Sequence, residues 1–255
     1  MRITVLTLAG SRYGLKLLNL LLWDGIPVEQ VVVLRDRRQL RLRWARGSAR
    51  RVGWPVVLGH ALWGLRSPFH RQGDVWRGKR LVLDYHRLAT RVDGVPSPRA
   101  PECLAALRAG RPELLLLAQT GLVPRCVLDI PTLATLNAHP GILPEYRGLN
   151  PDQWAIYERR FDRVGCSLHL VEPAIDRGPI LEVRPYTWRG DETLDRLAWR
   201  LNETCLDLLA GACRQRWPAY LSRAAPQGDG RLYSLIPPWL WPRVSWNLRR
   251  FLATR

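Results

Sequence analysis

Three side chains that could act together on a carbonyl group stand between residues 136 and 180 of this 255-residue chain. Asn137 and His139 are two residues apart in a segment with strand character, so their side chains project from the same face. Asp176 follows in a loop that ends in Gly-Pro. A carboxamide can donate a hydrogen bond to a carbonyl oxygen, an imidazole can exchange a proton near neutral pH, and a carboxylate can orient the imidazole. The pattern predicts a site that polarises a carbonyl and moves one proton.

The order of short motifs around these residues resembles the signature of the folate-dependent formyltransferase family, most clearly from about residue 95 to 210. The motifs are Asn137-Ala138-His139-Pro140-Gly141-Ile142-Leu143-Pro144, Tyr146-Arg147-Gly148, Ser167-Leu168-His169 and Asp176-Arg177-Gly178-Pro179-Ile180. The resemblance implies that Asn137, His139 and Asp176 are the catalytic residues. It also implies that 10-formyltetrahydrofolate is the formyl donor.

Transfer of a formyl group to an amine requires a held donor, a stabilised oxyanion and a route for the amine proton. We expect Asn137 to donate a hydrogen bond to the oxyanion. His139 would donate to the same oxygen and relay the proton, while Asp176 would hold the imidazole in one tautomer and could order a water. Because the amine itself attacks, neither a nucleophilic side chain nor a metal is needed.

Two loops are implied by the resemblance as walls of the donor site. The first, at residues 121–124, follows a buried strand and would contact the pterin ring through its backbone. The second lies just before Asp176. The implied donor-binding residues are Gly121, Leu122, Val123, Val171 and Ile175.

Arg147, Asn150 and His169 are candidates for binding the acceptor. Residues 146–151 could instead be only a turn that leads into a helix with Pro151 at its first position. His169 could be a partly buried strand residue, although it matches a histidine common in the family motif.

Two positions depart from the family pattern. Gly141 stands where many members have Ser, a change expected to leave the chemistry intact. The segment Gly10-Ser11-Arg12-Tyr13-Gly14 lacks the phosphate-binding turn of glycinamide ribonucleotide formyltransferases and the Gly-x-Gly-x-x-Gly fingerprint of dinucleotide sites. This disfavours a purine-pathway substrate.

Alternating strand and helix patterns position these motifs and predict right-handed crossovers in a mostly parallel sheet. Strands are expected at residues 3–8, 28–34, 81–85, 113–118, 135–137, 164–171 and 180–186, and helices at 14–23, 101–109, 151–160 and 192–215. Ser11 should cap the first helix, Gly25 should end it, and Asp191 should introduce the last. The expected fold class is α/β, a Rossmann-like formyltransferase fold whose central sheet is flanked by helices. Residues 1–222 would form the catalytic domain, and 223–255 a short Trp/Arg/Pro-rich extension that packs on this domain or on a partner.

Composition limits the remaining possibilities. The net charge is +17, and all but two of the 39 basic residues are arginines spread along the chain, which indicates a coding bias more than a nucleic-acid surface. Five scattered cysteines without Cys-x-x-Cys, and an N-terminus that enters a strand without a secretory signal, predict a cytoplasmic protein. The apolar stretch at 52–65 is shorter than the ~20 residues of a spanning helix, so membrane contact would be at most peripheral. A homodimer is possible, and nucleic acid is not the expected partner.

The leading hypothesis is an N-formyltransferase for a primary amine on a small molecule, either a nucleotide-linked amino sugar or a specialised metabolite. A methionyl-tRNA formyltransferase-like enzyme fits the charge, but that family carries a further C-terminal β-barrel domain. A formyltetrahydrofolate hydrolase would use water in place of the amine. A non-catalytic protein on the same scaffold could bind nucleic acid or membranes through the arginines at 35–51 and the Trp-rich tail.

Overall fold

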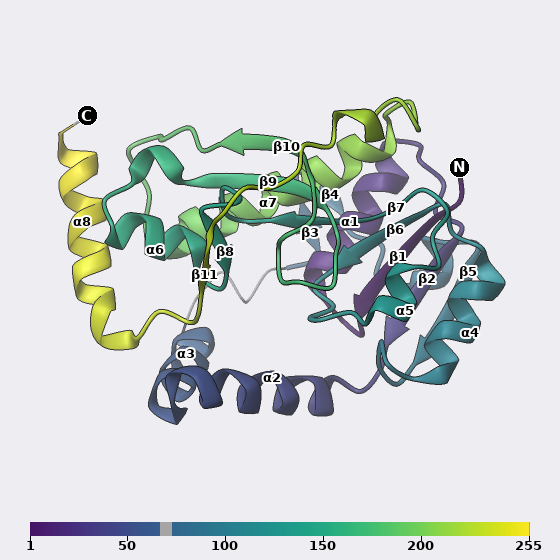
Figure 1. The fold of residues 1–255 in the computed structure, drawn as a ribbon, viewed down its shortest axis with the longest axis horizontal. Helices are drawn as coiled ribbons and strands as arrows, with labels where there is room; N and C mark the ends of the chain where they lie inside the picture. The colour runs from purple at the N-terminus through teal and green to yellow at the C-terminus, as the bar shows by residue number, and fades with distance from the viewer. Residues whose placement is uncertain (67–72, 255) are drawn as a thin grey trace.

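A central sheet organises the protein, whose computed structural model describes residues 1–66 and 73–254 (Figure 1). Within these residues the sheet has seven strands in the order β10-β9-β7-β6-β1-β2-β5. The sheet strands are β1 (Ile3–Leu8), β2 (Gln30–Leu34), β5 (Arg91–Val95), β6 (Leu114–Ala118), β7 (Ala134–His139), β9 (Gly165–Leu170) and β10 (Ile180–Pro185). The helices are α1 (Arg12–Trp23), α2 (Arg37–Val52), α3 (Trp54–Arg66), α4 (Pro101–Gly110), α5 (Arg125–Leu128), α6 (Pro151–Tyr157), α7 (Leu194–Cys213) and α8 (Trp241–Ala253).

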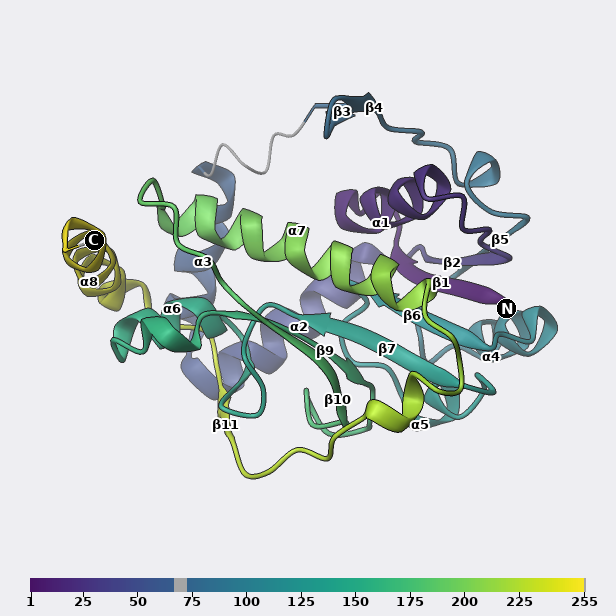
Figure 2. The same cartoon turned by 90° about the horizontal axis from the view of Figure 1, so that it is seen from above.

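The five strands from β5 to β7 run parallel, while β9 and β10 are antiparallel to their neighbours. Successive residues of β2 point to opposite faces, so Val31 and Val33 enter one buried cluster while Val32 and Leu34 enter another. Helices α1 and α7 cover the first face, and α4 and α5 cover the second (Figure 2). This confirms the predicted α/β class with a mostly parallel sheet, in which both faces are buried.

The first βα connection follows the sequence prediction closely. Ser11 caps α1 by accepting a hydrogen bond from the Gly14 amide at 3.2 Å. Gly25, with φ +68°, follows the helix end and adopts the left-handed conformation that glycine favours. A side chain at Gly14 would overlap Thr7 of β1, so glycine allows helix and strand to approach closely.

The strand expected at residues 81–85 is wrong. This segment instead leads into a 3-10 helix (Tyr85–Arg87), where the Asp84 carboxylate accepts from the His86 amide. The backbone N–H and C=O of Val82 are bonded by the Asn19 side chain of α1, so they are not available to a sheet. The edge strand is β5, which the charged, glycine-containing sequence at 91–95 did not reveal.

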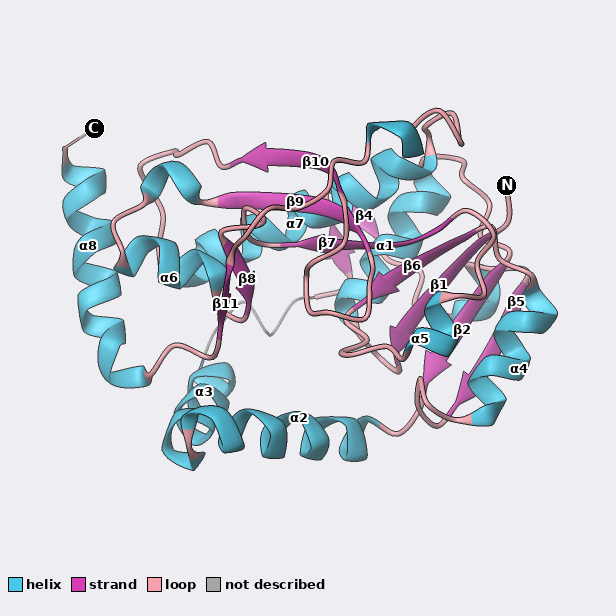
Figure 3. Ribbon diagram, in the orientation of Figure 1, coloured by secondary structure: helices cyan, strands magenta, loops and turns pink. Residues whose placement is uncertain are grey.

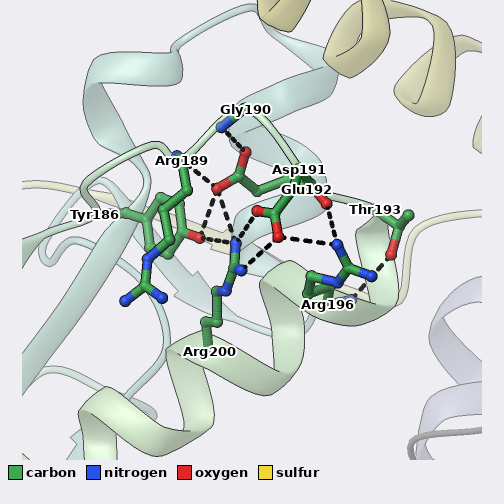
Figure 4. A network of polar contacts seen from close by, with 8 residues as sticks. All are labelled: Tyr186, Arg189, Gly190, Asp191, Glu192, Thr193, Arg196 and Arg200. Atoms are coloured by element: carbon green, nitrogen blue, oxygen red, sulfur yellow. Dashed lines mark hydrogen bonds and ion pairs between the residues drawn. The ribbon is translucent and has the colours of Figure 1, made fainter.

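The start of α7 also differs from the prediction. Thr193 is the N-cap and accepts from the Arg196 amide, whereas Asp191 lies before the helix and pairs with Arg196 and Arg200 (Figure 4). Glu192 is buried beside them and accepts hydrogen bonds from two backbone amides. These contacts fix the turn between β10 and α7.

Residues 35–66 and 73–80, the described parts of the arginine-rich region before β5, contain two helices and a hairpin. Helices α2 and α3 pack on each other outside the central sheet (Figure 3). The hairpin joins β3 (Val75–Trp76) to β4 (Lys79–Arg80) through Arg77 and Gly78, both at positive φ. The Gly-, Arg- and Asp-rich sequence that precedes residue 80 indicates a loop, and it falls partly on 67–72, outside the described residues.

The segment after residue 222 packs against the rest of the chain. Strand β11 (Arg231–Tyr233) pairs in parallel with β8 (Tyr146–Gly148), which follows the motif that contains Asn137 and His139. Helix α8 packs on α6 and buries Val244 and Leu248. Trp239, which precedes α8, is 65% exposed, and Trp246 on α8 is 50% exposed. Among the described residues, none of the helices combines the length and apolar character needed to cross a bilayer.

Candidate active site

Asn137 and His139 lie at the carboxyl end of β7, where open α/β sheets place their ligands. The antiparallel register with β9 sets Asn137 directly opposite His169. Asp176 reaches the same point from the loop after β9: its carboxylate oxygens lie 3.5 Å from His139 Nδ1 and 3.7 Å from His169 Nε2. The structure therefore brings together four of the six polar residues predicted from the sequence.

A chain of hydrogen bonds orients the Asn137 carboxamide. His169 Nδ1 donates to the carbonyl of Leu170 at 2.7 Å, so in the neutral ring Nε2 is an acceptor. Asn137 Nδ2 donates to this Nε2 at 3.2 Å. Burial lowers the pKa of His169 to about 4, against the opposing effect of Asp176, so the ring is neutral at physiological pH. The carboxamide N–H₂ group is thus fixed toward His169, with its second hydrogen left for another acceptor.

His139 is held from both sides of its ring. Its Nε2 donates to the backbone carbonyl of Tyr146 at 2.8 Å, and its side chain is only 5% exposed. Nδ1 is therefore the ring nitrogen that remains available for proton exchange, and it faces Asp176. The ring cannot turn without breaking the contact with β8.

The backbone conformation of the Asp176 loop explains why its motif contains glycine at position 178. Asp176 has φ +49°, and its carboxylate accepts a hydrogen bond from the Gly148 amide at 3.0 Å. Any side chain at Gly178 would overlap the carbonyl of Leu170, which already accepts from His169. The glycine of the Asp-x-Gly-Pro motif thus permits the loop to lie against β9.

Gly141 allows close packing around the site. A Cβ at this position would lie 2.7 Å from His139 Nε2 and 2.6 Å from Pro151 Cβ. The absence of a side chain allows His139, Tyr146 and the start of α6 to pack closely.

The two loops implied as donor walls border one apolar cluster. Val123 and Val171, from different loops, both pack on the cluster between the sheet and helices α4 and α5. Gly121 has φ +71°, Leu122 is 62% exposed, and Ile175 is half-buried. An apolar border with irregular backbone beside it suits a flat heteroaromatic ring that also needs hydrogen bonds.

The acceptor candidates Arg147 and Asn150 contact the C-terminal segment. Arg147 donates to the carbonyl of Gly230 at 2.7 Å, and Asn150 Oδ1 accepts from the Ile236 amide at 3.2 Å. Asn150 adopts φ +51° just before Pro151 begins α6, so the helix-turn role holds for this residue. The Nε atom of Arg147 is buried without a hydrogen-bond partner among the described residues.

Two residues near the site were not singled out from the sequence. Tyr146 was noted only within its motif, yet its carbonyl holds His139. Gln227 donates from Nε2 to the carbonyls of Asp176 and Gly178, at 3.1 and 2.6 Å. Its neighbours in sequence, Gly228-Asp229-Gly230, indicate a loop but not the contact of Gln227 with the Asp176 loop.

A basic hollow of about 590 Å³ lies elsewhere on the molecule, near the amino ends of β1 and β6. It includes Arg2, Arg108 and Arg111, and none of the catalytic candidates lines it. Because parallel strands place their amino and carboxyl ends at opposite edges, this hollow is separate from Asn137 and His139.

The structure is thus an α/β fold with an Asn, two His and an Asp gathered at the carboxyl end of β7. Residues 93–211 match the family described as formyl transferase. The methionyl-tRNA formyltransferase of Thermosynechococcus vestitus is 33% identical over 132 residues, which cover 52% of this chain and 38% of that protein. The chain thus spans less than half the length of this curated relative.

Solved structures show the same fold. Glycinamide ribonucleotide transformylase 1 from Symbiobacterium toebii matches with a TM-score of 0.55 and 19% identity, over 90% of this chain and 92% of that one. A sugar N-formyltransferase from a Shewanella species matches with a TM-score of 0.52 and 15% identity, over 91% and 77%. Residues 93–211, the part of the chain that the family match covers, belong to the folate-dependent formyltransferase family.

Proposed function

We propose that this protein is an N-formyltransferase that moves a formyl group from 10-formyltetrahydrofolate to a primary amine on a small molecule. The convergence of Asn137, His139 and Asp176 at one edge of the sheet carries this proposal. The acceptor class that we propose is an amino sugar, in particular a nucleotide-linked one.

The donor supplies an activated formyl group, and this chain can hold its ring between the loops at 121–123 and 171–175. Val123 and Val171 offer apolar contacts, since both border the same buried cluster. Gly121 leaves its backbone accessible, because no side chain covers it. These features support the choice of Gly121, Leu122, Val123, Val171 and Ile175 as donor-binding residues.

Asn137 is assigned to the oxyanion that develops when the amine adds to the formyl carbon. One hydrogen of its N–H₂ group is used by His169, which leaves the other to serve as the donor to the oxyanion. A donor that is already oriented stabilises developing charge without reorganisation. His169 is therefore a positioning residue in this account.

His139 and Asp176 are assigned to the amine proton. With Nε2 committed to the Tyr146 carbonyl, Nδ1 is the nitrogen that can take part in proton transfer. Asp176 faces Nδ1 and would stabilise the ring when it is protonated. The amine proton passes to His139 and Asp176, either directly or through a bound water. It is then delivered to the folate nitrogen that carried the formyl group as the bond from this nitrogen to the formyl carbon breaks, which gives the formamide and tetrahydrofolate.

Tetrahydrofolate release from 10-formyltetrahydrofolate, measured against a panel of nucleotide-linked amino sugars and other amines, tests the proposal. We expect release with at least one amine, reduced by on the order of a hundredfold in Asn137→Ala and Asp176→Asn. Formate release that needs no amine would instead support hydrolysis. Inactivity across the panel, with no folate binding, would contradict the proposal.

A second candidate is formylation of methionyl-tRNA. It is supported by the names of relatives such as that of Thermosynechococcus vestitus and by the net charge of +17. Charged initiator tRNA added to the same assay separates the two, because transfer to its methionyl amine and none to sugars would select this alternative.

A further inference from the structure

Helix α3 presents an apolar face to solvent. Its residues Trp54, Leu58 and Leu62 recur every four positions and are 52%, 57% and 59% exposed. Pro55 and Ala61, which are also exposed, fall on the same third of the helix surface. The opposite side is apolar as well, with Val56 and Val57 buried against Leu235 and α2. We call the exposed side, residues 54, 55, 58, 61 and 62, the α3 apolar face.

A helix that is apolar all round is normally buried in a protein core or in lipid. No charged residue occurs from Trp54 to Leu65, yet α3 lies outside the central sheet (Figure 1). Trp239 adds a further exposed aromatic ring nearby, since its neighbour Pro238 packs on Gly59 of α3. Single exposed leucines are common, but an ordered stripe of this kind marks an interaction surface.

The helix beside this face is strongly basic. Helix α2 packs against α3, and its residues Arg38, Arg46, Arg50 and Arg51 are exposed. The whole chain has a net charge of +17, so an anionic surface would be attracted to helices α2 and α3 from a distance.

We propose that α2 and α3 bind an anionic lipid surface, with the α3 apolar face inserted among the lipids at the headgroup boundary. A Trp and two Leu on one face, next to arginines that reach phosphate groups, is the composition of helices that lie in the membrane interface. The inference is independent of the formyl-transfer proposal, because none of these residues belongs to the candidate active site.

Two other occupants fit less well. A second copy of the chain would bring two arginine-rich α2 helices together, and their like charges would repel each other. RNA would use the arginines, but the aliphatic pair Leu58 and Leu62 offers neither a cation for phosphate nor a ring for stacking. Lipid is the partner that uses both the charges and the aliphatic groups.

Co-sedimentation of the full chain with vesicles tests the proposal. Vesicles of phosphatidylcholine alone are compared with equal mixtures of phosphatidylcholine and phosphatidylglycerol, at low and moderate salt. We expect binding to the mixed vesicles, weakened by salt, and reduced about tenfold or more by Leu58→Glu with Leu62→Glu. Arg46→Glu with Arg50→Glu should weaken binding to anionic vesicles by a comparable factor.

Matched controls separate this face from general effects. Leu22 of α1 and Leu83 are each 45% exposed, so Leu22→Glu with Leu83→Glu adds the same charge at other apolar surface positions and should bind vesicles as wild type does. Arg99→Glu, in an exposed loop, is the control for charge reversal. All variants should retain the wild-type circular dichroism spectrum.

Three results would overturn the proposal. The first is an absence of vesicle binding, or binding that the Leu58 and Leu62 substitutions leave unchanged. The second is a dimeric mass by light scattering that becomes monomeric in the same variant, which would assign the face to a second copy. The third is binding to RNA, lost in these variants, without binding to vesicles.

Discussion

The backbone carbonyl of Tyr146 accepts a hydrogen bond from Nε2 of His139 at 2.8 Å. A residue whose side chain takes no part in the proposed chemistry thereby decides which imidazole nitrogen faces Asp176. Tyr146 is itself fixed, since its hydroxyl donates to Glu158 at 2.7 Å and its ring stacks on Tyr233. The orientation of the proposed proton-transfer group therefore depends on contacts made by β8 and β11.

Removal of the Tyr233 hydroxyl should loosen this support. Tyr233 OH contacts both carboxylate oxygens of Glu158, at 2.9 and 3.0 Å. Tyr233→Phe should cost about 1 kcal/mol of stability, because the carboxylate keeps its bond from Tyr146. Thermal unfolding measures the loss, and kcat should fall while KM for the donor is unchanged. Tyr157→Phe on α6 is the matched control; an equal effect in both variants would argue against a specific role for Tyr233.

The buried His169 should make stability sensitive to mild acid. Burial lowers the pKa of His169 to about 4 from 6.5, so below pH 6.5 the unfolded chain takes up a proton that the folded chain does not. Its contribution is present above pH 6.5 and is lost as the pH falls toward 4. His169→Gln should flatten the fall in melting temperature over this range. An identical pH dependence in the variant would contradict the assignment.

The same variant tests the positioning role of His169. Gln can still accept from Asn137 Nδ2, whereas Leu cannot. We expect His169→Leu to lower kcat by roughly tenfold or more, with partial recovery in His169→Gln, since a misdirected oxyanion donor loses much of its effect. Equal kcat values in His169→Leu and His169→Gln would contradict the positioning role of His169.

Gln227 should matter for activity more than for stability. Its side chain bonds the backbone of the Asp176 loop at two carbonyls, and Gln227→Leu would release both. We expect kcat/KM to fall by roughly tenfold, because small displacements of a catalytic group are costly. The matched control is Gln215→Leu at the exposed end of α7, where the side chain bonds only its own helix. A loss of the same size in the control would show that the effect is not specific to the loop.

The turn before α7 should contribute stability that acid removes. Burial alone would raise the pKa of Glu192, but hydrogen bonds from the Arg189 amide and the Tyr186 hydroxyl outweigh it and lower the pKa. Arg200 likewise lowers the pKa of Asp191 to about 2. Since both folded values lie below the unfolded ones, the stabilisation is present above about pH 4.5 and is lost as the pH falls toward 2. In Glu192→Gln, urea unfolding should show about 1–3 kcal/mol less stability at pH 7 and a smaller difference at pH 3.

The sequence was sufficient where a local pattern decides the structure. Asn137 and His139 share a strand face by simple alternation, and the Asp-x-Gly-Pro motif identifies Asp176 without any knowledge of tertiary contacts. Ser11 and Gly25 mark the start and the end of α1, because helix capping depends on residues that are close in the sequence. The family resemblance confirmed by comparison also supplied the α/β fold.

Contacts between distant segments could not be predicted in the same way. The pairing of β11 with β8 and the hydrogen bonds from Gln227 join residues that are about fifty or more positions apart in the sequence. A polar loop sequence carries no signal for either contact. The edge strand β5 was missed because Asp93 and Gly94 suit a loop, yet the Asp93 side chain pairs with Arg91 and Gln30. In each case tertiary contacts override local propensity.

The most direct test of the central claim follows the formyl carbon itself. Donor labelled with ¹³C at the formyl group is mixed with the amine identified in the panel, and the label is followed by NMR in wild type, Asn137→Ala and Asp176→Asn. We expect wild type to move the label into a formamide on the acceptor amine and both variants to leave it on the folate. Label that collects as free formate in wild type, or that reaches the amine equally fast in the variants, would contradict this claim.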